Sequence, residues 1–182
     1  MRVKKRVAVF LDRDGVINEN REGYVKSRDE FYFIPGSLRA MRMLYQCGYL
    51  LFIVSNQQGV PKGEVKLENL KEIDKHMEET FKNNGINVQR IYYCLHLESD
   101  NCKCRKPKTH FILDAAREFD IDLKHSYVIG DSTKDIKMGR DAGCITVLVR
   151  TGLGGRDGAY KIKPHMEASS LLEAAKKITG RN

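Results

Sequence analysis

Short apolar runs that alternate with helical patterns are the feature of this sequence that most constrains its fold. Four continuous apolar runs lie at residues 7–11, 50–54, 127–129 and 145–149, and a weaker run, rich in β-branched and aromatic residues, lies at 88–93. Runs of this length predict strands that are buried on both faces of a sheet. Between them, apolar residues recur at helical spacing around 38–44, 67–81, 111–119 and 170–178. The alternation predicts an α/β fold with a doubly wound parallel sheet.

The length of the chain suits one ordinary domain. It has 182 residues, of which 41% are hydrophobic, so we expect residues 1–182 to form one soluble domain. No apolar run approaches the roughly 20 residues that span a bilayer, and the one that follows the basic residues 1–6 is too short for a signal peptide. We therefore expect a cytoplasmic protein with no membrane partner.

Two segments fall outside the alternation of strands and helices. Residues 15–34 are polar and are expected to form a flap or hairpin over the end of the sheet. Residues 150–163 are basic and rich in glycine, and they are expected to form a mobile loop.

The positive charge of the chain suits an anionic partner. Lys plus Arg number 32 and Asp plus Glu number 24, which gives a net charge of +8. The basic residues are scattered and no helix-turn-helix or base-stacking motif is present, so we expect no nucleic-acid partner. A nucleotide kinase is disfavoured because the sequence has no phosphate-binding loop of the form G-x-x-x-x-G-K-S/T.

Two carboxylates follow the first apolar run. Strand side chains alternate, so Asp12 and Asp14 can lean toward the same space at the strand end, where Gly15 lets the chain turn away. Carboxylates this close would repel each other unless a cation lay between them, and Mg²⁺ prefers oxygen ligands of this kind. One aspartate can also attack phosphorus to form an aspartyl-phosphate, while a second serves as general acid and base. Two aspartates in an ordinary turn have the same spacing, so this motif alone barely favours a function.

Three further motifs offer groups that bind phosphate or metal, although each also fits an ordinary polar turn or helix cap. Ser55-Asn56-Gln57 follows the second run, and its hydroxyl and backbone N–H groups can hold phosphoryl oxygens. Arg105 and Lys106 can grip a phosphate and offset its charge. Asp131 follows the run at 127–129 and can complete a magnesium shell. Asp135 could ligate the metal through water or cap the next helix, and a cap or an orienting role is favoured.

The five cysteines indicate a metal site rather than a disulfide framework, because their number is odd and three of them lie close together. A closed tetrahedral zinc site takes thiolates and imidazoles, and this donor set is supplied by Cys94, His96, Cys102 and Cys104. With no ligand position left open, the zinc would be structural, and it would position Arg105 and Lys106. A redox pair or chance spacing are weaker alternatives. Cys47 and Cys144 are expected in the core.

The order of these motifs resembles that of the haloacid dehalogenase superfamily of phosphatases over most of the chain. In that pattern an Asp-x-Asp, a Ser or Thr, a Lys and a final Gly-Asp follow successive strands. The resemblance implies that Asp12 is the nucleophile and that Asp14 is the general acid and base. It also implies that Ser55 and Lys106 stabilise the phosphoryl group, and that Mg²⁺ is held by Asp12, Asp14 and Asp131.

The zinc loop resembles that of a subgroup which contains heptose-bisphosphate and histidinol-phosphate phosphatases. Members lack a large cap domain, so we expect a minimal cap and a monomer. The resemblance implies that the substrate is contacted by Arg21, Glu22, Gly23, Tyr24, Asn56, Gln57 and Arg105. The chain departs from the subgroup at Ser132, where relatives often carry Lys or Arg, and at Leu95, where Pro is usual.

Two features bear on the substrate within this subgroup. Residues 23–25 and 149–152 resemble the heptose enzymes, whereas the short gap in the zinc loop occurs in histidinol-phosphate enzymes and in some heptose enzymes. We expect a phosphorylated sugar substrate and Mg²⁺-dependent hydrolysis of the 7-phosphate of D-glycero-D-manno-heptose 1,7-bisphosphate through an aspartyl-phosphate. The alternatives are a histidinol-phosphate phosphatase and, from another class, a phospho-acceptor signalling domain, which Asp14 and the zinc loop disfavour.

Overall fold

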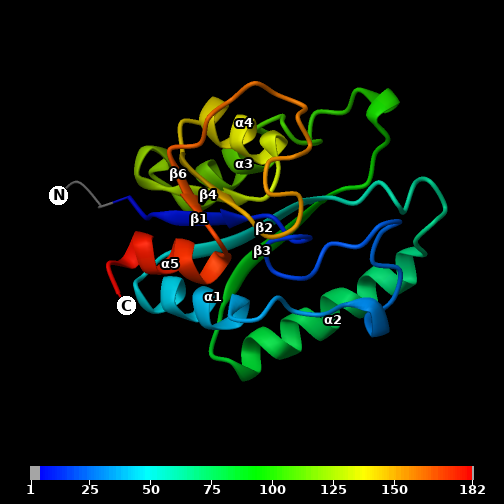
Figure 1. Ribbon diagram of the computed structural model, residues 1–182, viewed down its shortest axis with the longest axis horizontal. Helices are drawn as coiled ribbons and strands as arrows, with labels where there is room; N and C mark the ends of the chain where they lie inside the picture. Colours follow the sequence, from blue (N-terminus) through cyan, green and yellow to red (C-terminus); the bar gives the residue numbers. More distant parts are fainter. Residues whose placement is uncertain (1–4, 182) are drawn as a thin grey trace.

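A six-stranded parallel sheet forms the centre of the molecule (Figure 1). The computed structural model describes residues 5–181, so the first four residues of the basic N-terminal stretch lie outside the described residues. The strands are β1 (Ala8–Leu11), β2 (Leu50–Asn56), β3 (Val88–Cys94), β4 (Tyr127–Gly130), β5 (Ile145–Val149) and β6 (Met166–Ala168). Their order across the sheet is β3-β2-β1-β4-β5-β6. The predicted fold class is therefore confirmed.

The core has two layers because side chains of each strand alternate between the faces of the sheet. In β1, Val9 and Leu11 pack into the cluster on one face, while Ala8 and Phe10 pack into the cluster on the other. All four side chains are completely buried. This burial on both sides explains why the strand reads as an uninterrupted apolar run.

Helices cover both faces of the sheet (Figure 1). One face is covered by α1 (Ser37–Gln46), α2 (Leu67–Asn83) and α5 (Leu171–Thr179). The other is covered by α3 (His110–Phe119) and α4 (Thr133–Asp141). Among the described residues, no helix is both long enough and apolar enough to cross a membrane.

The predicted flap or hairpin at residues 15–34 is a hairpin-like excursion from the end of β1. Its two ends pair through an antiparallel bridge between Asn18 and Phe33. Four of its side chains are buried in the core, so the polar segment still contributes to it: Val16, Ile17, Val25 and Phe31. Between these ends, the short 3-10 helix η1 spans Arg28–Glu30.

The strand order places a ligand site at one edge of the sheet. From β1 the chain builds outward to β2 and β3 on one side, and to β4, β5 and β6 on the other. Loops diverge at such a reversal, and ligands in open α/β sheets bind outside the carboxyl ends of the strands at this point. Asp12 follows β1, Ser55 lies at the end of β2 and Asp131 follows β4. The fold therefore gathers the predicted site residues at its switch point.

Candidate active site

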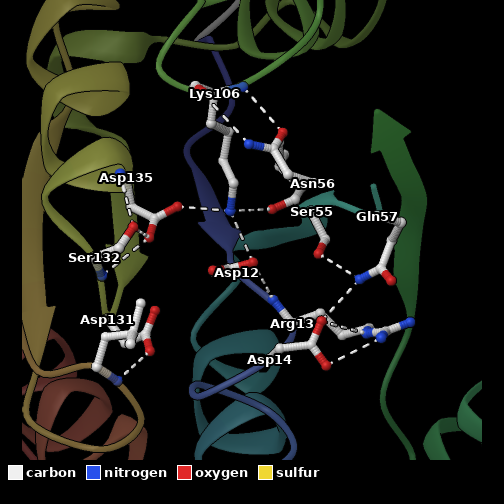
Figure 2. Close-up of polar contacts among 12 residues, drawn as sticks. Asp12, Arg13, Asp14, Ser55, Asn56, Gln57, Lys106, Asp131, Ser132 and Asp135 are labelled. Atoms are coloured by element: carbon white, nitrogen blue, oxygen red, sulfur yellow. Dashed lines mark hydrogen bonds and ion pairs between the residues drawn. The ribbon is translucent and has the colours of Figure 1, made fainter. Parts of the chain in front are cut away.

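A cavity of about 190 Å³ opens at the carboxyl ends of β1, β2 and β4. Its lining includes eight of the site residues predicted from the sequence: Asp12, Asp14, Tyr24, Ser55, Asn56, Arg105, Lys106 and Asp131. Because Arg105 is among them, the zinc loop reaches the same space as the strand ends. Figure 2 shows how most of these side chains converge.

Lys106 is the buried cation at the centre of the site. Its Nζ lies 2.8 Å from Asp12 Oδ1 and 2.7 Å from Asp135 Oδ1, and it donates to the Val54 carbonyl at 3.1 Å (Figure 2). Burial would lower the pKa of Lys106, but the two carboxylates outweigh it and hold the pKa above its ordinary value. The ammonium group therefore remains charged and can attract phosphoryl oxygens beside Asp12.

Asn56 fastens Lys106 to the end of β2. The Lys106 backbone N–H donates to Asn56 Oδ1 at 3.0 Å, and Asn56 Nδ2 donates to the Lys106 carbonyl at 3.4 Å. Both polar ends of the Asn56 side chain are thus engaged by the zinc loop, although the residue also lines the cavity. Its predicted contact with substrate stays a prediction.

Asp135 acts as a helix cap, which was one of the two roles that its position suggested. Its Oδ2 accepts from the Ser132 backbone N–H at 3.2 Å and from Ser132 Oγ at 2.5 Å. The Asp135 N–H donates back to Ser132 Oγ, completing a capping box at the start of α4. The remaining oxygen faces Lys106, so one aspartate connects α4 to this buried lysine.

The Asp14 carboxylate is held by four donors. Oδ1 accepts from Arg13 Nη2 at 3.0 Å and Asn18 Nδ2 at 2.9 Å, and Oδ2 accepts from Gln57 Nε2 at 2.8 Å and Arg13 Nε at 3.2 Å. Burial would raise the pKa of Asp14, but the Arg13 guanidinium and these donors hold it below its ordinary value. Gln57 also donates to Ser55 Oγ at 2.9 Å, which links Asp14 to the predicted phosphoryl-binding hydroxyl.

Carboxylate oxygens gather where a hard cation could bind. One oxygen each from Asp12, Asp131 and Asp135 lies within 4.8 Å of the others. Burial raises the pKa of Asp12 to about 7 against the opposing charge of Lys106, and burial beside Asp12 raises the pKa of Asp131 to about 8. A divalent cation would supply the positive charge that these buried carboxylates lack, and their oxygens are the donors that Mg²⁺ prefers.

Asp14 was also predicted as a magnesium ligand, but its carboxylate is not part of this group. The alternation argument assumes that the strand continues, whereas β1 ends at Leu11 and Asp14 already lies in the turn beyond it. There the neighbouring Arg13 engages both of its oxygens. Asp135 occupies the third position in the group instead.

Two glycines let the chain approach Asp131 closely. Gly15 has a φ of 85° and Gly152 a φ of 57°, and a Cβ on either would lie 2.2 Å from Asp131 Oδ2. That oxygen accepts from the Leu153 backbone N–H at 2.6 Å, and the Asp131 carbonyl accepts from Gly155 at 2.7 Å. The loop expected to be mobile is thus bonded to the site at Asp131.

The four predicted zinc ligands meet in one cluster. The Sγ atoms of Cys94 and Cys104 each lie 3.6 Å from Cys102 Sγ, and they lie 3.7 and 3.4 Å from His96 Nδ1. Zn–S bonds of about 2.3 Å and Zn–N bonds of about 2.0 Å in a tetrahedron require ligand separations of roughly 3.5–3.8 Å. The cluster therefore has the donor set and the size of a structural zinc site.

Arg105 connects this cluster to the cavity. Its Nη1 donates to the His96 carbonyl at 3.3 Å, and its Nη2 donates to Gln58 Oε1 at 2.8 Å. The guanidinium group is thus tied to the zinc loop on one side and to the segment after β2 on the other. A metal that fixes the loop would also fix the position of this cation.

The predicted sugar-binding stretch divides between two cavities. Tyr24 lines the cavity at the strand ends, whereas Arg21 and Gly23 line a neighbouring cavity of about 470 Å³ that also includes Asp14 and Tyr24. Glu22 is exposed and is not among the lining residues described for either cavity. Tyr24 therefore stands at the boundary between the two spaces.

Besides Ser132, five residues that line the cavity at the strand ends were not predicted as site residues from the sequence: Asn20, Gln58, Lys134, Leu153 and Asp157. Gln58 directly follows the Ser-Asn-Gln motif, so extending that motif by one residue would have found it. Lys134 lies two residues beyond Ser132 and brings a cation to the cavity. Asn20 and Asp157 lie in loops with no apolar pattern to mark their position.

The chain is similar to proteins of known activity. The HAD-hydrolase-like family model matches residues 103–174. The chain is 38% identical to D-glycero-beta-D-manno-heptose-1,7-bisphosphate 7-phosphatase of Pasteurella multocida, and the match covers 93% of this chain and 98% of that protein. It is 39% identical to D-glycero-alpha-D-manno-heptose-1,7-bisphosphate 7-phosphatase of Campylobacter jejuni, with 80% of this chain and 83% of that protein covered.

A solved structure has the same fold. The crystal structure of D,D-heptose 1,7-bisphosphate phosphatase from B. bronchiseptica, complexed with magnesium and phosphate, matches with a TM-score of 0.89. The two chains are 32% identical, and the match covers 96% of this chain and 98% of that one.

Proposed function

The chain belongs to the family of D-glycero-D-manno-heptose-1,7-bisphosphate 7-phosphatases, and from this premise we propose that it hydrolyses the 7-phosphate of that sugar bisphosphate. The relatives include enzymes named for the alpha and for the beta anomer, so the proposal covers both. The observation that carries it is the convergence of Asp12, Asp14 and Lys106 on one cavity. We also propose that residues 1–182 act as one domain, as a monomer in the cytoplasm.

Asp12 is the nucleophile in this proposal. One of its carboxylate oxygens attacks phosphorus, and the bond between phosphorus and the C7 oxygen of the sugar breaks. Asp14 is ionised in the free site, where its pKa is lowered, so in this proposal the charge of the bound phosphate raises that pKa and Asp14 binds a proton before the step. It donates this proton to the departing oxygen, so the sugar leaves as an alcohol. Asp14 then takes a proton from water as the water oxygen attacks phosphorus. The bond to Asp12 breaks, inorganic phosphate leaves, and both aspartates return to their starting states.

Lys106 and Ser55 stabilise the phosphoryl group during both steps. Lys106 Nζ lies 2.8 Å from Asp12 Oδ1, so its charge is placed beside the reacting oxygen. Ser55 Oγ accepts from Gln57, which leaves the hydroxyl proton free to be donated to a phosphoryl oxygen. Asp12 and Asp131 would hold Mg²⁺, which would neutralise phosphoryl charge. The predicted part of Asp14 in holding magnesium stays a prediction, and its carboxylate is engaged by Arg13, Asn18 and Gln57.

The zinc loop supplies the contact with the second phosphate. Arg105 lines the cavity and carries a guanidinium group suited to bidentate phosphate binding. We propose that the cluster of Cys94, His96, Cys102 and Cys104 holds a structural zinc ion, and that Tyr24 and its neighbours contact the sugar.

The decisive test compares substrates. We expect kcat/KM for a heptose 1,7-bisphosphate to exceed that for histidinol phosphate by at least roughly 100-fold, because only the bisphosphate has a remote anion whose binding can align the reacting group. Both anomers should be measured, together with a heptose 7-monophosphate. A clear preference for histidinol phosphate would contradict the proposed substrate and favour the histidinol-phosphate alternative.

The variant Arg105→Ala sharpens this comparison. It should lower kcat/KM for the bisphosphate more than for the monophosphate, because the lost charge-assisted contact serves only the second phosphate. Arg90→Ala is the matched control, because its guanidinium pairs with Glu118 on the surface and lies outside the cavity.

Chelation should separate the two metals. We expect EDTA to lower activity by at least roughly 100-fold, and added Mg²⁺ to restore it, because magnesium held by a few carboxylates and water exchanges readily. Zinc content measured on the same sample should stay near one ion per chain. Full activity in magnesium-free, chelator-treated protein would contradict the magnesium requirement.

A further inference from the structure

Arg13 is a buried arginine between the two predicted catalytic aspartates. Its side chain is 1% exposed, and it is the largest fully buried side chain in the described part of the molecule. Two of its three guanidinium nitrogens pair with Asp14: Nε with Oδ2 at 3.2 Å and Nη2 with Oδ1 at 3.0 Å. We propose that Arg13 is a positioning residue that fixes the plane of the Asp14 carboxyl group for proton transfer. This inference rests on the role of Asp14 in the proposed function.

Three segments hold the guanidinium group in place. The Phe31 and Tyr93 ring centroids lie 6.0 and 5.7 Å from its Cζ, and these rings come from the hairpin-like segment and from β3. Tyr93 is fixed in turn, because its hydroxyl donates to Asp74 Oδ1 on α2 at 2.5 Å. The position of Arg13 is therefore set by elements that lie outside the catalytic loops.

Stability alone does not account for this arrangement. A fully buried cation loses its hydration, and a buried ion pair is often no more stabilising than apolar side chains of the same volume. Moreover, Arg13 Nη1 has no hydrogen-bond partner among the described residues, so part of the desolvation cost is not offset. What the pair provides is geometry, because a guanidinium fork engages both carboxylate oxygens in one plane.

The other donors to Asp14 cannot provide the same constraint. Asn18 Nδ2 reaches only Oδ1, and Gln57 Nε2 reaches only Oδ2. Either one alone would leave the carboxyl group free to rotate about a single contact, and together they hold the two oxygens through two separate side chains rather than through one planar group. Only the Arg13 fork holds both oxygens through one rigid group, so its loss should misdirect proton transfer without removing the acid.

Two substrates with different leaving groups distinguish a positioning role of Arg13 from a general structural role. A sugar alkoxide leaves only if it is protonated, whereas 4-nitrophenolate leaves readily as an anion. In Arg13→Met, which keeps an unbranched chain between the two rings, we expect the first-turnover rate with heptose bisphosphate to fall roughly 100-fold. With 4-nitrophenyl phosphate it should fall less than about threefold. In this variant the phosphoenzyme should form quickly from 4-nitrophenyl phosphate but be hydrolysed slowly, because Asp14 is still needed to activate water. We therefore expect a burst of one nitrophenolate per chain.

Two further variants make the result interpretable. Arg13→Lys keeps the cation but loses the fork, so it should show the same selective loss to a smaller degree and serves if Arg13→Met does not fold. Ser126→Ala is the structural control: its Oγ joins Ala8 at the start of β1 to Asp122, away from the site, and it should leave the ratio of the two rates unchanged. Equal losses for both substrates in the Arg13 variants, or no loss for either, would overturn the inference.

Asp14→Asn separates this inference from the role of Asp14 itself. If Asp14→Asn shows the selective loss and the Arg13 variants do not, only the inference about Arg13 fails. If Asp14→Asn shows no selectivity between the two substrates, the assignment of Asp14 as general acid fails, and the inference about Arg13 fails with it.

Discussion

Replacing Asp12 with asparagine should lower turnover of the heptose bisphosphate by at least roughly 10⁴-fold, because no phosphoenzyme can form without its carboxylate oxygen. The Asp12 side chain is 12% exposed and its Oδ1 lies 2.8 Å from Lys106 Nζ. Among the described residues it is the carboxylate that both contacts this lysine and directly follows β1. Phosphate release under single-turnover conditions measures the loss directly. The same preparation should keep its melting temperature within a few degrees, because an uncharged amide replaces a carboxylate whose burial disfavours its charge.

A matched substitution controls for the loss of a carboxylate as such. Asp122→Asn changes a carboxylate that caps the 3-10 helix η3 (Leu123–His125) and pairs with His125, away from the cavity, so activity should stay within about twofold. A fluoride mimic of the phosphoryl group should bind the native protein at the Asp12 oxygen. If Asp12→Asn retained substantial activity, or if the mimic bound elsewhere, another residue would have to be the nucleophile.

The sequence predicts the sheet well because its strands are buried on both faces. That environment forces nearly every residue of β1 and β5 to be apolar, so the runs at 7–11 and 145–149 mark the strands almost to the residue. β6 was missed for the opposite reason. Met166–Ala168 is a three-residue edge strand whose central residue is exposed, so it has neither an apolar run nor a clear alternation.

For the site, the sequence predicts where the backbone brings residues together but not which contacts their side chains make. Parallel strands place Asp12, Ser55 and Asp131 together because their carboxyl ends share an edge, which the sequence order already implies. The partner that each carboxylate oxygen contacts is determined by the segments that follow the strands. The sequence does not show that Arg13 turns back to engage Asp14, or that a helix cap at Asp135 also reaches Lys106.

Zinc should be present at one ion per chain in protein purified without added metal, and Cys102→Ser should remove it. Four donors with tetrahedral separations leave no position open, and structural zinc sites of this type bind tightly because every ligand is supplied by the protein. Elemental analysis of the native protein and the variant measures the stoichiometry. Cys47→Ser is the matched control, because Cys47 lies at the end of α1, outside the cluster, and its loss should leave zinc content unchanged.

Loss of the zinc should reach the active site through the loop that carries Arg105 and Lys106. Arg105 Nη1 donates to the carbonyl of the zinc ligand His96, and Lys106 follows directly in the chain, so a loosened loop displaces both cations. A shift of about 1 Å in a group that contacts the reacting phosphate can cost roughly 100-fold in rate, and we expect a loss of that order for the bisphosphate in Cys102→Ser. The sheet should stay folded, since its core lies in clusters on either face that do not depend on the loop. Native protein that is free of zinc yet fully active would show that the four ligands serve another purpose.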